Sequence, residues 1–352
     1  MHNLHSLSCL FVFSLYNSIQ TLKPDMIVVL GDISAKGSEL TERKWISVIE
    51  QFEGISGHHS SLPLLISLGD KDVGTCANLE RKIVHRRAKH LPGLDSCGYG
   101  AFEVSNVSFV SLNAVALLCG NHDLWCGAEK FMERESHHFQ TKNQGECYPL
   151  GCEKREGSTD ISWRQNSMES GSGPVILLHF PLHRFDAEIT GVPTSSEAIV
   201  SDHSLFRQFS QVQNKVTIDS MCIMIGCLVH SSYEITSMTV NLCDYHIRRL
   251  YDHLHILPAN STQYILQALK PRIIFNAHIG SFSDFLHADG TREVTVPAMT
   301  CKTKGVLGFV ITAFDTKGTV TLSCCLLAKE WHVIMGYLAF LCLTALSVKL
   351  SH

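Results

Sequence analysis

Four short apolar segments in this chain of 352 residues are each followed closely by an acidic residue or a histidine. The segments and the residues that follow them are 26–30 with Asp32, 64–68 with Asp70, 175–178 with His179, and 273–275 with His278. Uninterrupted apolar runs of this length are typical of strands that are buried on both faces of a sheet. Parallel strands end at the same edge of a sheet, so the pattern predicts four side chains converging along one edge.

Two carboxylates and two imidazoles form a ligand set that suits divalent ions such as zinc, manganese or iron. In a two-metal site, such ions clamp the attacking and the leaving oxygens of a phosphate ester. A single acidic residue after a strand is more often a turn or capping residue. An ordered series of four strand ends favours a metal centre instead, with Asp32, Asp70, His179 and His278 as ligands.

The segments between these runs predict an α/β fold. Trp45 and Ile49 recur at helical spacing after a capping Thr41, which predicts a helix over 42–53 between the first two strands. Strand, helix and strand joined by short loops form a βαβ unit with parallel strands. Further predicted elements are a helix over 79–92, a hairpin over 102–104 and 107–112, a helix over 263–269 capped by Asn260, and strands over 293–296, 309–314 and 320–326 in a second sheet. Residues 206–255 show no steady period, and we assign no element to them.

The charge balance of the chain gives no sign of nucleic-acid binding. Lys and Arg number 29 and Asp and Glu number 33, for a net charge of −4, and no basic stripe is present. Charged residues make up only 18% of the chain and mean hydropathy is +0.09, which suits a globular domain that carries a membrane segment. Residues 333–348 contain no charge. We expect a transmembrane helix over 331–348, with a buried core helix as the alternative.

The N-terminus, the cysteines and the glycosylation sequons constrain the cellular location less. Residues 1–23 lack a basic n-region and a small-residue cleavage site, so they favour an amphipathic helix over a weak signal anchor. The 14 cysteines include no CxxC pair and force no disulfide framework. Asn106 and Asn260 each begin an Asn-x-Ser/Thr sequon, and both are expected to be glycosylated if this part of the chain lies in a secretory lumen.

Five segments and the C-terminal apolar run carry a family pattern. The segments are KPDMIVVLGD (23–32), LLISLGDKD (64–72), VSFVSLNAVAL (107–117), LLHFPLHR (177–184) and LKPRIIFNAHIGSF (269–282). They resemble the calcineurin-like metallophosphoesterases. Within that superfamily they are similar to the membrane-bound phosphoesterases that remodel glycosylphosphatidylinositol (GPI) anchors, a branch related to the yeast cell-division-control protein 1 group. The resemblance implies a four-layer α/β/β/α metallophosphoesterase sandwich with a C-terminal transmembrane helix.

The same resemblance implies a domain organisation and a function. An atypical segment at 1–23 would precede a phosphoesterase-like domain over 24–328, with insertions over 126–173 and 200–257, and the membrane helix over 331–348 would follow. The implied activity is metal-dependent hydrolysis of a phosphodiester, such as ethanolamine phosphate on a GPI anchor. The implied location is the membrane of the endoplasmic reticulum or Golgi, with the main domain of the glycoprotein in the lumen.

Taken residue by residue, the resemblance implies that one metal site is kept and the other is dismantled. Asp32 matches the bridging aspartate of the family's GD motif, and His179 and His278 match two of its metal histidines. Asp70 stands where the family has an asparagine ligand. Gly280 stands where the family has the second histidine of its GHxH motif, and the opening D-x-H or D-x-Q motif is missing. The implied cofactor is therefore one divalent metal (Mn, Zn or Fe) instead of two.

The resemblance also bears on residues outside the ligand set. Lys71 stands where the family has the histidine that protonates the leaving group, and its cation suits stabilisation of phosphate charge better than proton transfer. His183 and Arg184 would contact the substrate phosphate, or else pair with other protein groups. His122 belongs to a literal GNHD sequence and is a rival to Asp70, but its motif comes later in the chain than the family order requires.

These substitutions predict weak or absent turnover and leave alternatives open. One alternative is a catalytically inactive phosphoesterase scaffold in the membrane, which binds a lipid head group or assists cargo export. Another is a truncated or alternatively spliced product, which the missing first strand and the irregular residues 206–255 favour. The expected partners are a phosphodiester or GPI-type lipid and the membrane, and nucleic acid is not among them.

Overall fold

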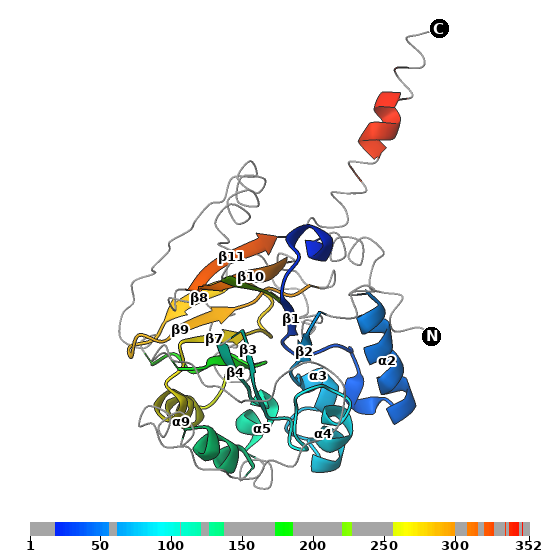
Figure 1. The fold of residues 1–352 in the computed structure, drawn as a ribbon. Helices are drawn as coiled ribbons and strands as arrows, with labels where there is room; N and C mark the ends of the chain where they lie inside the picture. Colours follow the sequence, from blue (N-terminus) through cyan, green and yellow to red (C-terminus); the bar gives the residue numbers. More distant parts are fainter. Residues whose placement is uncertain are drawn as a thin grey trace, which may run out of the picture.

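Two β-sheets form the centre of a mixed α/β fold (Figure 1). The structure is a computed structural model. It describes residues 18–55, 62–105, 107–120, 127–136, 173–185, 220–226, 256–299, 308–315, 320–326, 335, 338–344 and 347. The central strands of both sheets are short and buried, as their uninterrupted apolar sequences predict.

The first sheet has five strands in the order β11-β10-β6-β1-β2. They are β1 (Met26–Val29), β2 (Leu64–Ile66), β6 (Ser220–Gly226), β10 (Gly308–Asp315) and β11 (Val320–Leu326). β1 runs parallel to β2 and to β6, so Val28 lies opposite Leu65 on one side and Ile225 on the other. β10 and β11 continue the sheet as antiparallel strands beyond β6. Both hydrogen-bonding edges of β1 are therefore occupied.

The second sheet has six strands in the order β3-β4-β5-β7-β9-β8. They are β3 (Gly100–Val104), β4 (Val107–Ser111), β5 (Val175–Leu177), β7 (Ile273–Asn276), β8 (Ser283–Leu286) and β9 (Arg292–Thr295). The inner four run parallel, with Leu177 of β5 opposite Ser111 and Phe275. An antiparallel hairpin closes each edge. The carboxyl ends of β5 and β7 consequently lie side by side.

The helices flank these sheets. They are α2 (Glu42–Ile55), α3 (Asp70–Val73), α4 (Arg81–Ala88), α5 (Ala114–Cys119) and α9 (Ala259–Leu269), with a 3-10 turn η1 (Gly37–Glu39) and helical residues at 18–22 and 127–136. In Figure 1, α2, α3 and α4 gather beside β1 and β2. The buried face of α2 contains Trp45, Ile49 and Phe52, which are spaced as in an amphipathic helix.

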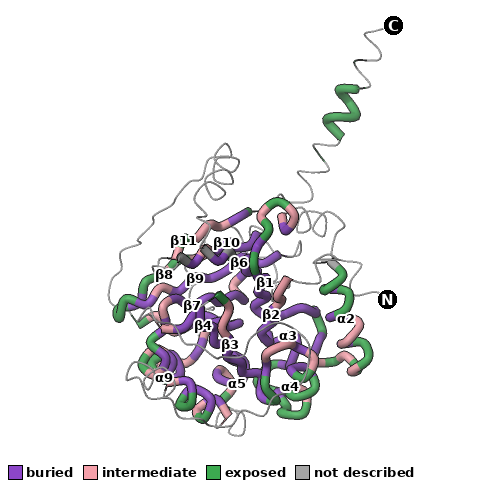
Figure 2. Tube along the Cα trace, viewed as in Figure 1, coloured by how far each residue is buried: buried purple, intermediate pink, exposed green. Residues whose placement is uncertain are grey.

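Side chains along the central strands alternate between two hydrophobic clusters. Val28 of β1 shares a cluster with Leu177 and Phe275 of the other sheet. The preceding residue, Ile27, points to the other face of β1 and belongs to the cluster that contains Trp45 of α2. Burial on both faces of β1 follows from this arrangement (Figure 2). The two sheets thus face each other across an apolar layer, and their ends are held in fixed relative positions.

Several sequence predictions are confirmed and several are wrong. The helix over 42–53 is α2, and the predicted hairpin is β3–β4. The four apolar runs do not share one sheet edge, because β1 and β2 belong to the first sheet and β5 and β7 to the second. The prediction that 293–296, 309–314 and 320–326 share a second sheet is also wrong. The first of these strands lies in the sheet of β5 and β7, and the other two lie in the sheet of β1 and β2.

Other corrections concern the ends of elements. The helix predicted over 79–92 is shorter, spanning Arg81–Ala88. Asn260 does not cap α9, because Pro258 occupies the N-cap position and Asn260 lies in the first turn. The segment 206–255, to which no element was assigned, contains strand β6 beside β1. Residues 1–17 of the predicted N-terminal helix, and most of the predicted insertions over 126–173 and 200–257, lie outside the described residues.

The described part of the chain contains no helix that is both long and apolar enough to cross a membrane. Of the span predicted over 331–348, the structure describes residues 335, 338–344 and 347, and all of these are exposed. Exposed apolar side chains there include Leu338, Phe340, Leu341 and Leu343.

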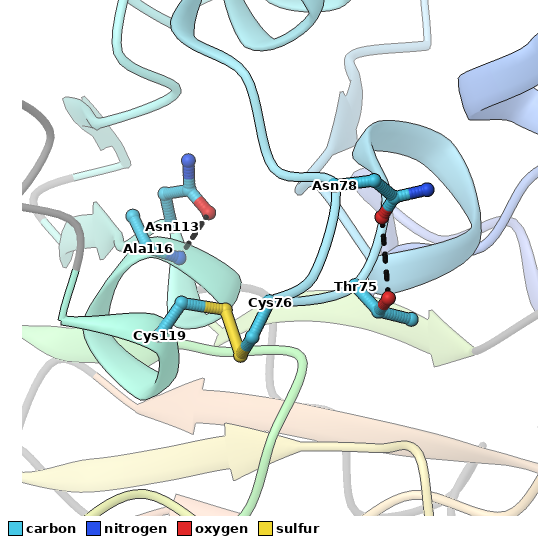
Figure 3. Close-up of a disulfide and its surroundings, with 6 residues drawn as sticks. All are labelled: Thr75, Cys76, Asn78, Asn113, Ala116 and Cys119. Atoms are coloured by element: carbon cyan, nitrogen blue, oxygen red, sulfur yellow. Dashed lines mark hydrogen bonds between the residues drawn. A yellow bond between two sulfur atoms is a disulfide. The ribbon is translucent and has the colours of Figure 1, made fainter.

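A disulfide that the sequence did not predict joins the loop after α3 to the end of α5. Cys76 is bonded to Cys119 across a sequence separation of 43 residues (Figure 3). Local hydrogen bonds order both ends of the bridge: Thr75 Oγ1 donates to Asn78 Oδ1, and the amide of Ala116 donates to Asn113 Oδ1 at the start of α5. The disulfide therefore connects a loop that follows β2 of the first sheet to the helix that follows β4 of the second.

We predict that the double substitution Cys76→Ser, Cys119→Ser lowers the free energy of unfolding by about 4 kcal/mol, because it releases a loop of this length in the unfolded chain. Urea denaturation of the purified protein measures the change. Cys342→Ser, at an exposed free cysteine, is the matched control and should leave the midpoint unchanged. Equal midpoints for the double variant and the wild type would contradict the structural role of this disulfide.

Candidate metal centre

The end of β1 and the start of α3 present two carboxylates to a common space. Asp32 is buried and has φ 56°, a left-handed conformation that is uncommon outside glycine. Its Oδ1 accepts a hydrogen bond of 2.9 Å from the amide of Lys71. Asp70, the first residue of α3, is 8% exposed. The strained backbone at Asp32 is thus held in place by the neighbouring loop, as is common at functional sites.

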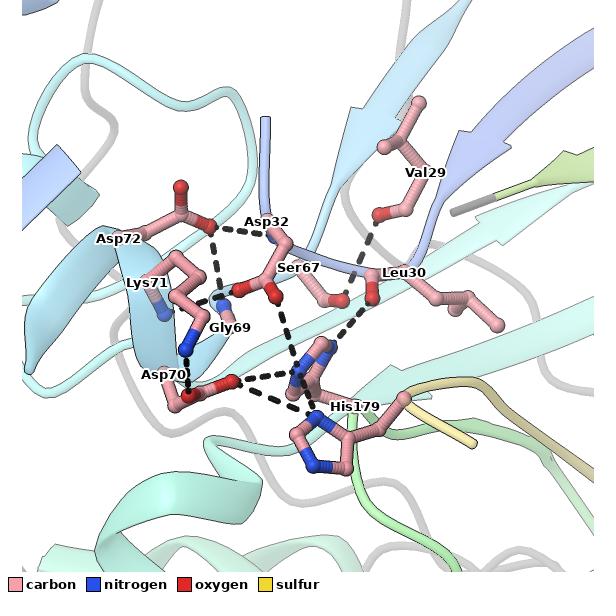
Figure 4. A network of polar contacts seen from close by, with 10 residues as sticks. Val29, Leu30, Asp32, Ser67, Gly69, Asp70, Lys71, Asp72 and His179 are labelled. Atoms are coloured by element: carbon pink, nitrogen blue, oxygen red, sulfur yellow. Dashed lines mark hydrogen bonds and ion pairs between the residues drawn. The ribbon is translucent and has the colours of Figure 1, made fainter. Parts of the chain in front are cut away.

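Asp72 connects the end of β1 to the start of α3 by hydrogen bonds. Its Oδ2 accepts hydrogen bonds from the amide of Asp32, at 2.8 Å, and from the amide of Gly69, at 3.0 Å (Figure 4). Burial raises the pKa of the Asp72 carboxyl to about 6. Sequence reasoning did not assign Asp72 a role, although it is the second carboxylate of the Gly-Asp-Lys-Asp turn.

The two histidines come from the opposite sheet. His179 follows β5, and its Nδ1 lies 2.7 Å from the carbonyl oxygen of Leu30 at the end of β1. A carbonyl only accepts, so Nδ1 of His179 carries the proton and donates it. In the neutral ring the lone pair of His179 is then on Nε2, which faces the two carboxylates (Figure 4). His278 follows β7 with φ 67° and directs its Nδ1 toward the same point.

Side chains of Asp32, Asp70, His179 and His278 form one compact group. One ligand atom from each lies within 4.8 Å of every other, and all four residues are buried. His179 Nε2 is 3.1 Å from Asp70 Oδ1, 3.1 Å from His278 Nδ1 and 3.6 Å from Asp32 Oδ2. His278 Nδ1 is 3.4 Å from Asp70 Oδ1. The structure thus brings together the four residues that the sequence singled out.

This group fits a divalent cation. Asp32 Oδ2 is buried and has no hydrogen-bond partner among the described residues, which is unfavourable for a carboxylate unless a cation lies against it. When His179 is neutral, its Nε2 lone pair faces the acceptor oxygen Asp70 Oδ1 at 3.1 Å with no proton between them, and a bound cation would relieve that repulsion. Two oxygen and two imidazole nitrogen donors suit manganese, zinc or iron. The donor set therefore indicates divalent metal binding.

The pKa values of these groups follow from burial and mutual charge. Burial raises the pKa of Asp32 well above its ordinary value, and His179 only partly opposes this. Burial lowers the pKa of His179, but the charges of Asp32 and Asp70 outweigh it and raise that pKa to about 9. Burial also raises the pKa of Asp70, yet hydrogen bonds from His179 and His278 hold it well below its usual range. The field that favours positive charge on His179 also favours a cation.

Two glycines leave the room that the site needs. A Cβ on Gly31 would lie 2.7 Å from His179 Nδ1 and would break the bond from His179 to Leu30. A Cβ on Gly69 would meet Asp32 Oδ1 and come within 2.6 Å of the Asp32 amide. The glycine before each aspartate is therefore required by packing, in addition to the positive φ of Gly31.

The other predicted site residues lie outside the four-residue group. Lys71 is at the rim, 26% exposed, with Nζ 3.3 Å from Asp70 Oδ2. Arg184 points into another set of contacts: it donates to Ser283 Oγ at 3.1 Å and lies 4.4 Å above the ring of Phe285. The amide of His183 donates to the hydroxyl of Thr262 in α9. The Arg184 side chain thus makes structural contacts, whereas Nδ1 of the His183 ring is buried without a hydrogen-bond partner among the described residues, so its role stays a prediction.

The remaining candidates cannot all be placed. His122, the rival to Asp70, and the sequon residue Asn106 lie outside the described residues. Asn260 is exposed on α9, as a glycosylation site requires. Gly280 has φ 76° and supplies no side chain to the site.

We predict that Gly69→Ala destabilises the fold by about 1–3 kcal/mol, because the new methyl group overpacks against Asp32. The same change should weaken divalent metal binding, since Asp32 must move aside. Thermal unfolding and metal titration measure the two effects. Gly54→Ala in α2 is the control: nothing lies within 4 Å of its Cβ, so it should stabilise slightly and leave metal affinity unchanged. Wild-type metal affinity in Gly69→Ala would contradict this description of the site.

Comparison with known proteins shows that the chain is similar to several proteins described as Metallophosphoesterase 1. The chain is 22% identical to Metallophosphoesterase 1 of Danio rerio over 336 residues, which cover 95% of this chain and 72% of the relative. It is 22% identical to that of Xenopus laevis over 332 residues, covering 92% and 67%. For that of Mus musculus the identity is 23% over 318 residues, covering 90% and 64%. The chain therefore spans only part of the length of these relatives.

Other comparisons add less. No family model matches the chain. A dimetal phosphatase structure from Danio rerio aligns with 90% of this chain and 85% of its own, at 12% identity and a TM-score of 0.42, which is too distant a likeness to carry an argument. The homology to Metallophosphoesterase 1 proteins over nine tenths or more of the chain supports the metallophosphoesterase superfamily.

Proposed function

We propose that this chain is a metal-dependent phosphoesterase that hydrolyses a phosphodiester, built on a four-layer α/β/β/α sandwich. The observation that carries the proposal is the buried group of Asp32, Asp70, His179 and His278, in which a carboxylate oxygen of Asp32 accepts no hydrogen bond. Metallophosphoesterase 1 homologues support the same class of reaction. The proposed cofactor is a divalent ion of manganese, zinc or iron.

We propose one cation and not two, because the described residues offer one ligand set of this kind. Gly280, two residues after His278, has no side chain with which to bind a second ion. The expected activity is correspondingly weaker than that of a two-metal enzyme.

The protein groups around the site have distinct parts in the proposed reaction. A divalent ion, when bound by the four residues, supplies Lewis-acid polarisation of a phosphoryl oxygen and lowers the pKa of nearby water. Leu30 holds His179 in the tautomer that presents Nε2 to the site. Lys71 Nζ, at the rim, is placed to balance negative charge on a phosphate oxygen. Phe180, 2% exposed and packed against the His278 ring, limits access of water from that side.

We further propose that the substrate is a membrane phosphodiester, such as ethanolamine phosphate on a GPI anchor, and that the chain acts at the endoplasmic reticulum or Golgi membrane with its main domain in the lumen. The family resemblance motivates this proposal. The Cys76–Cys119 disulfide supports it, because such bonds persist in oxidising compartments. The exposed apolar residues over 338–344 favour contact with a membrane, and exposed Asn260 suits glycosylation.

A catalytically inactive scaffold is the second candidate. It is favoured by Lys71 in place of the acid histidine and by Gly280 in place of a ligand, since each change removes a group that supports turnover in the family. Such a protein would keep the metal group and bind a phosphate-bearing head group without cleaving it. Metal content and turnover, measured together, separate the two candidates.

We predict that the full chain binds one divalent ion per molecule and slowly hydrolyses bis-p-nitrophenyl phosphate. His179→Ala and Asp70→Ala should each remove the metal and the turnover, because each deletes a ligand. Elemental analysis and absorbance of released nitrophenolate measure the two. One metal with no turnover would favour the scaffold. Loss of both on His122→Ala but not on Asp70→Ala would show that the ligand assignment is wrong.

We also predict that Lys71→Ala lowers kcat roughly 100-fold while metal content is unchanged, because a cation that balances charge on the reacting phosphate is removed. Lys71→Arg, which keeps the charge, should lose less. Lys36→Ala, at an exposed lysine paired with Glu39, is the matched control. Steady-state kinetics on the metal-loaded protein decide the matter, and an unchanged kcat in Lys71→Ala would rule out this role.

A further inference from the structure

The buried carboxylate of Glu293 lies outside the four-residue group, and sequence reasoning assigned it no role. Glu293 of β9 is 0% exposed. Its Oε1 accepts hydrogen bonds from the amide of Leu182, at 2.8 Å, and from Nδ2 of Asn276, at 2.6 Å. Its Oε2 lies 2.9 Å from His287 Nε2 and 3.7 Å from Arg184 Nε. Four donor groups therefore surround one carboxylate that the solvent does not reach.

The partners of Glu293 come from the two segments that carry the histidine ligands. Leu182 lies three residues after His179 in the loop that follows β5. Asn276 is the last residue of β7 and lies two residues before His278. Their two hydrogen bonds end on the same oxygen atom of Glu293. One side chain from β9 thus ties both histidine-bearing segments to a single point.

The contacts of Glu293 also explain why its carboxylate is tolerated in the interior. A buried carboxylate is unfavourable unless hydrogen bonds and opposite charge compensate it. Arg184 supplies that charge, and Ser283 and the Phe285 ring hold Arg184 in place. With a guanidinium already beside it, Glu293 is not itself placed to bind a second metal ion. Its contacts instead hold the loop after β5 and the end of β7 in position.

We propose that Glu293 is a positioning residue of the metal centre, which fixes His179 and His278 through the Leu182 amide and the Asn276 side chain. Groups that orient metal ligands in this way change metal affinity or activity by about 10–100-fold when they are removed. Loss of Oε1 would leave two buried donors without their acceptor, so the loop after His179 and the end of β7 would shift to find others. This inference rests on the metal centre proposed above.

The test is titration of Co²⁺ into the metal-free full chain, followed by the visible absorption spectrum of the bound ion, with thermal unfolding of the metal-free protein in parallel. Glu293→Leu should weaken Co²⁺ binding about 10–100-fold and change the spectrum. Glu293→Gln keeps an oxygen that accepts from Leu182 and Asn276, so it should stay within about threefold of the wild type. Asp284→Asn, which disturbs the exposed pair with Arg292 on the same hairpin, is the control and should change neither affinity nor spectrum.

Each outcome decides one point. Wild-type affinity and spectrum in Glu293→Leu, even with a lower Tm, would show a purely structural role and overturn the inference. If Glu293→Leu does not fold, Asn276→Ala cuts only the connection to the His278 segment: about tenfold weaker binding supports the inference and unchanged binding overturns it. A wild-type protein that binds no Co²⁺ would overturn the metal centre itself.

Discussion

The hydrogen bond from His179 Nδ1 to the carbonyl oxygen of Leu30 joins the two sheets at the functional site. Its donor follows β5 in one sheet, and its acceptor ends β1 in the other. The apolar layer between the sheets brings these ends together, and this bond then sets both the ring orientation and the tautomer of His179. The Nε2 of His179 faces Asp32 and Asp70 because the other nitrogen is committed to Leu30.

Much of this site was predictable because its residues obey local rules. A buried strand needs an apolar sequence, and a polar residue directly after it is placed at the strand end. That logic found Asp32, Asp70, His179 and His278 without any knowledge of the topology. It did not find the two-sheet arrangement, since strand order depends on long-range packing that short apolar runs do not specify. The four residues converge whether their strands share one sheet or two, because facing sheets also bring strand ends together.

What the sequence did not reveal are the contacts between distant segments. Asp72 acts on Asp32 across 40 residues, and Glu293 acts on Leu182 across 111. Neither carboxylate differs locally from an ordinary turn or strand residue, so no periodicity distinguishes it. The pairing of β6 with β1 and the Cys76–Cys119 bond are of the same kind. Such partners are set by the assembled fold, and a single sequence carries little information about them.

The position of the ligands between two sheets has a consequence for stability. A cation bound by Asp32 and Asp70 on one side and by His179 and His278 on the other would cross-link the sheets at their carboxyl ends. A ligand that binds only the folded state stabilises it by about 2.7 kcal/mol at 100 times its Kd. Burial, with added repulsion from Asp70 and Asp72, raises the pKa of Asp32, so ionisation of this carboxyl is unfavourable in the folded chain and a bound cation would offset that cost. Metal binding and sheet packing are therefore expected to be coupled, so a metal at this site would contribute to the stability of the fold apart from any role in turnover.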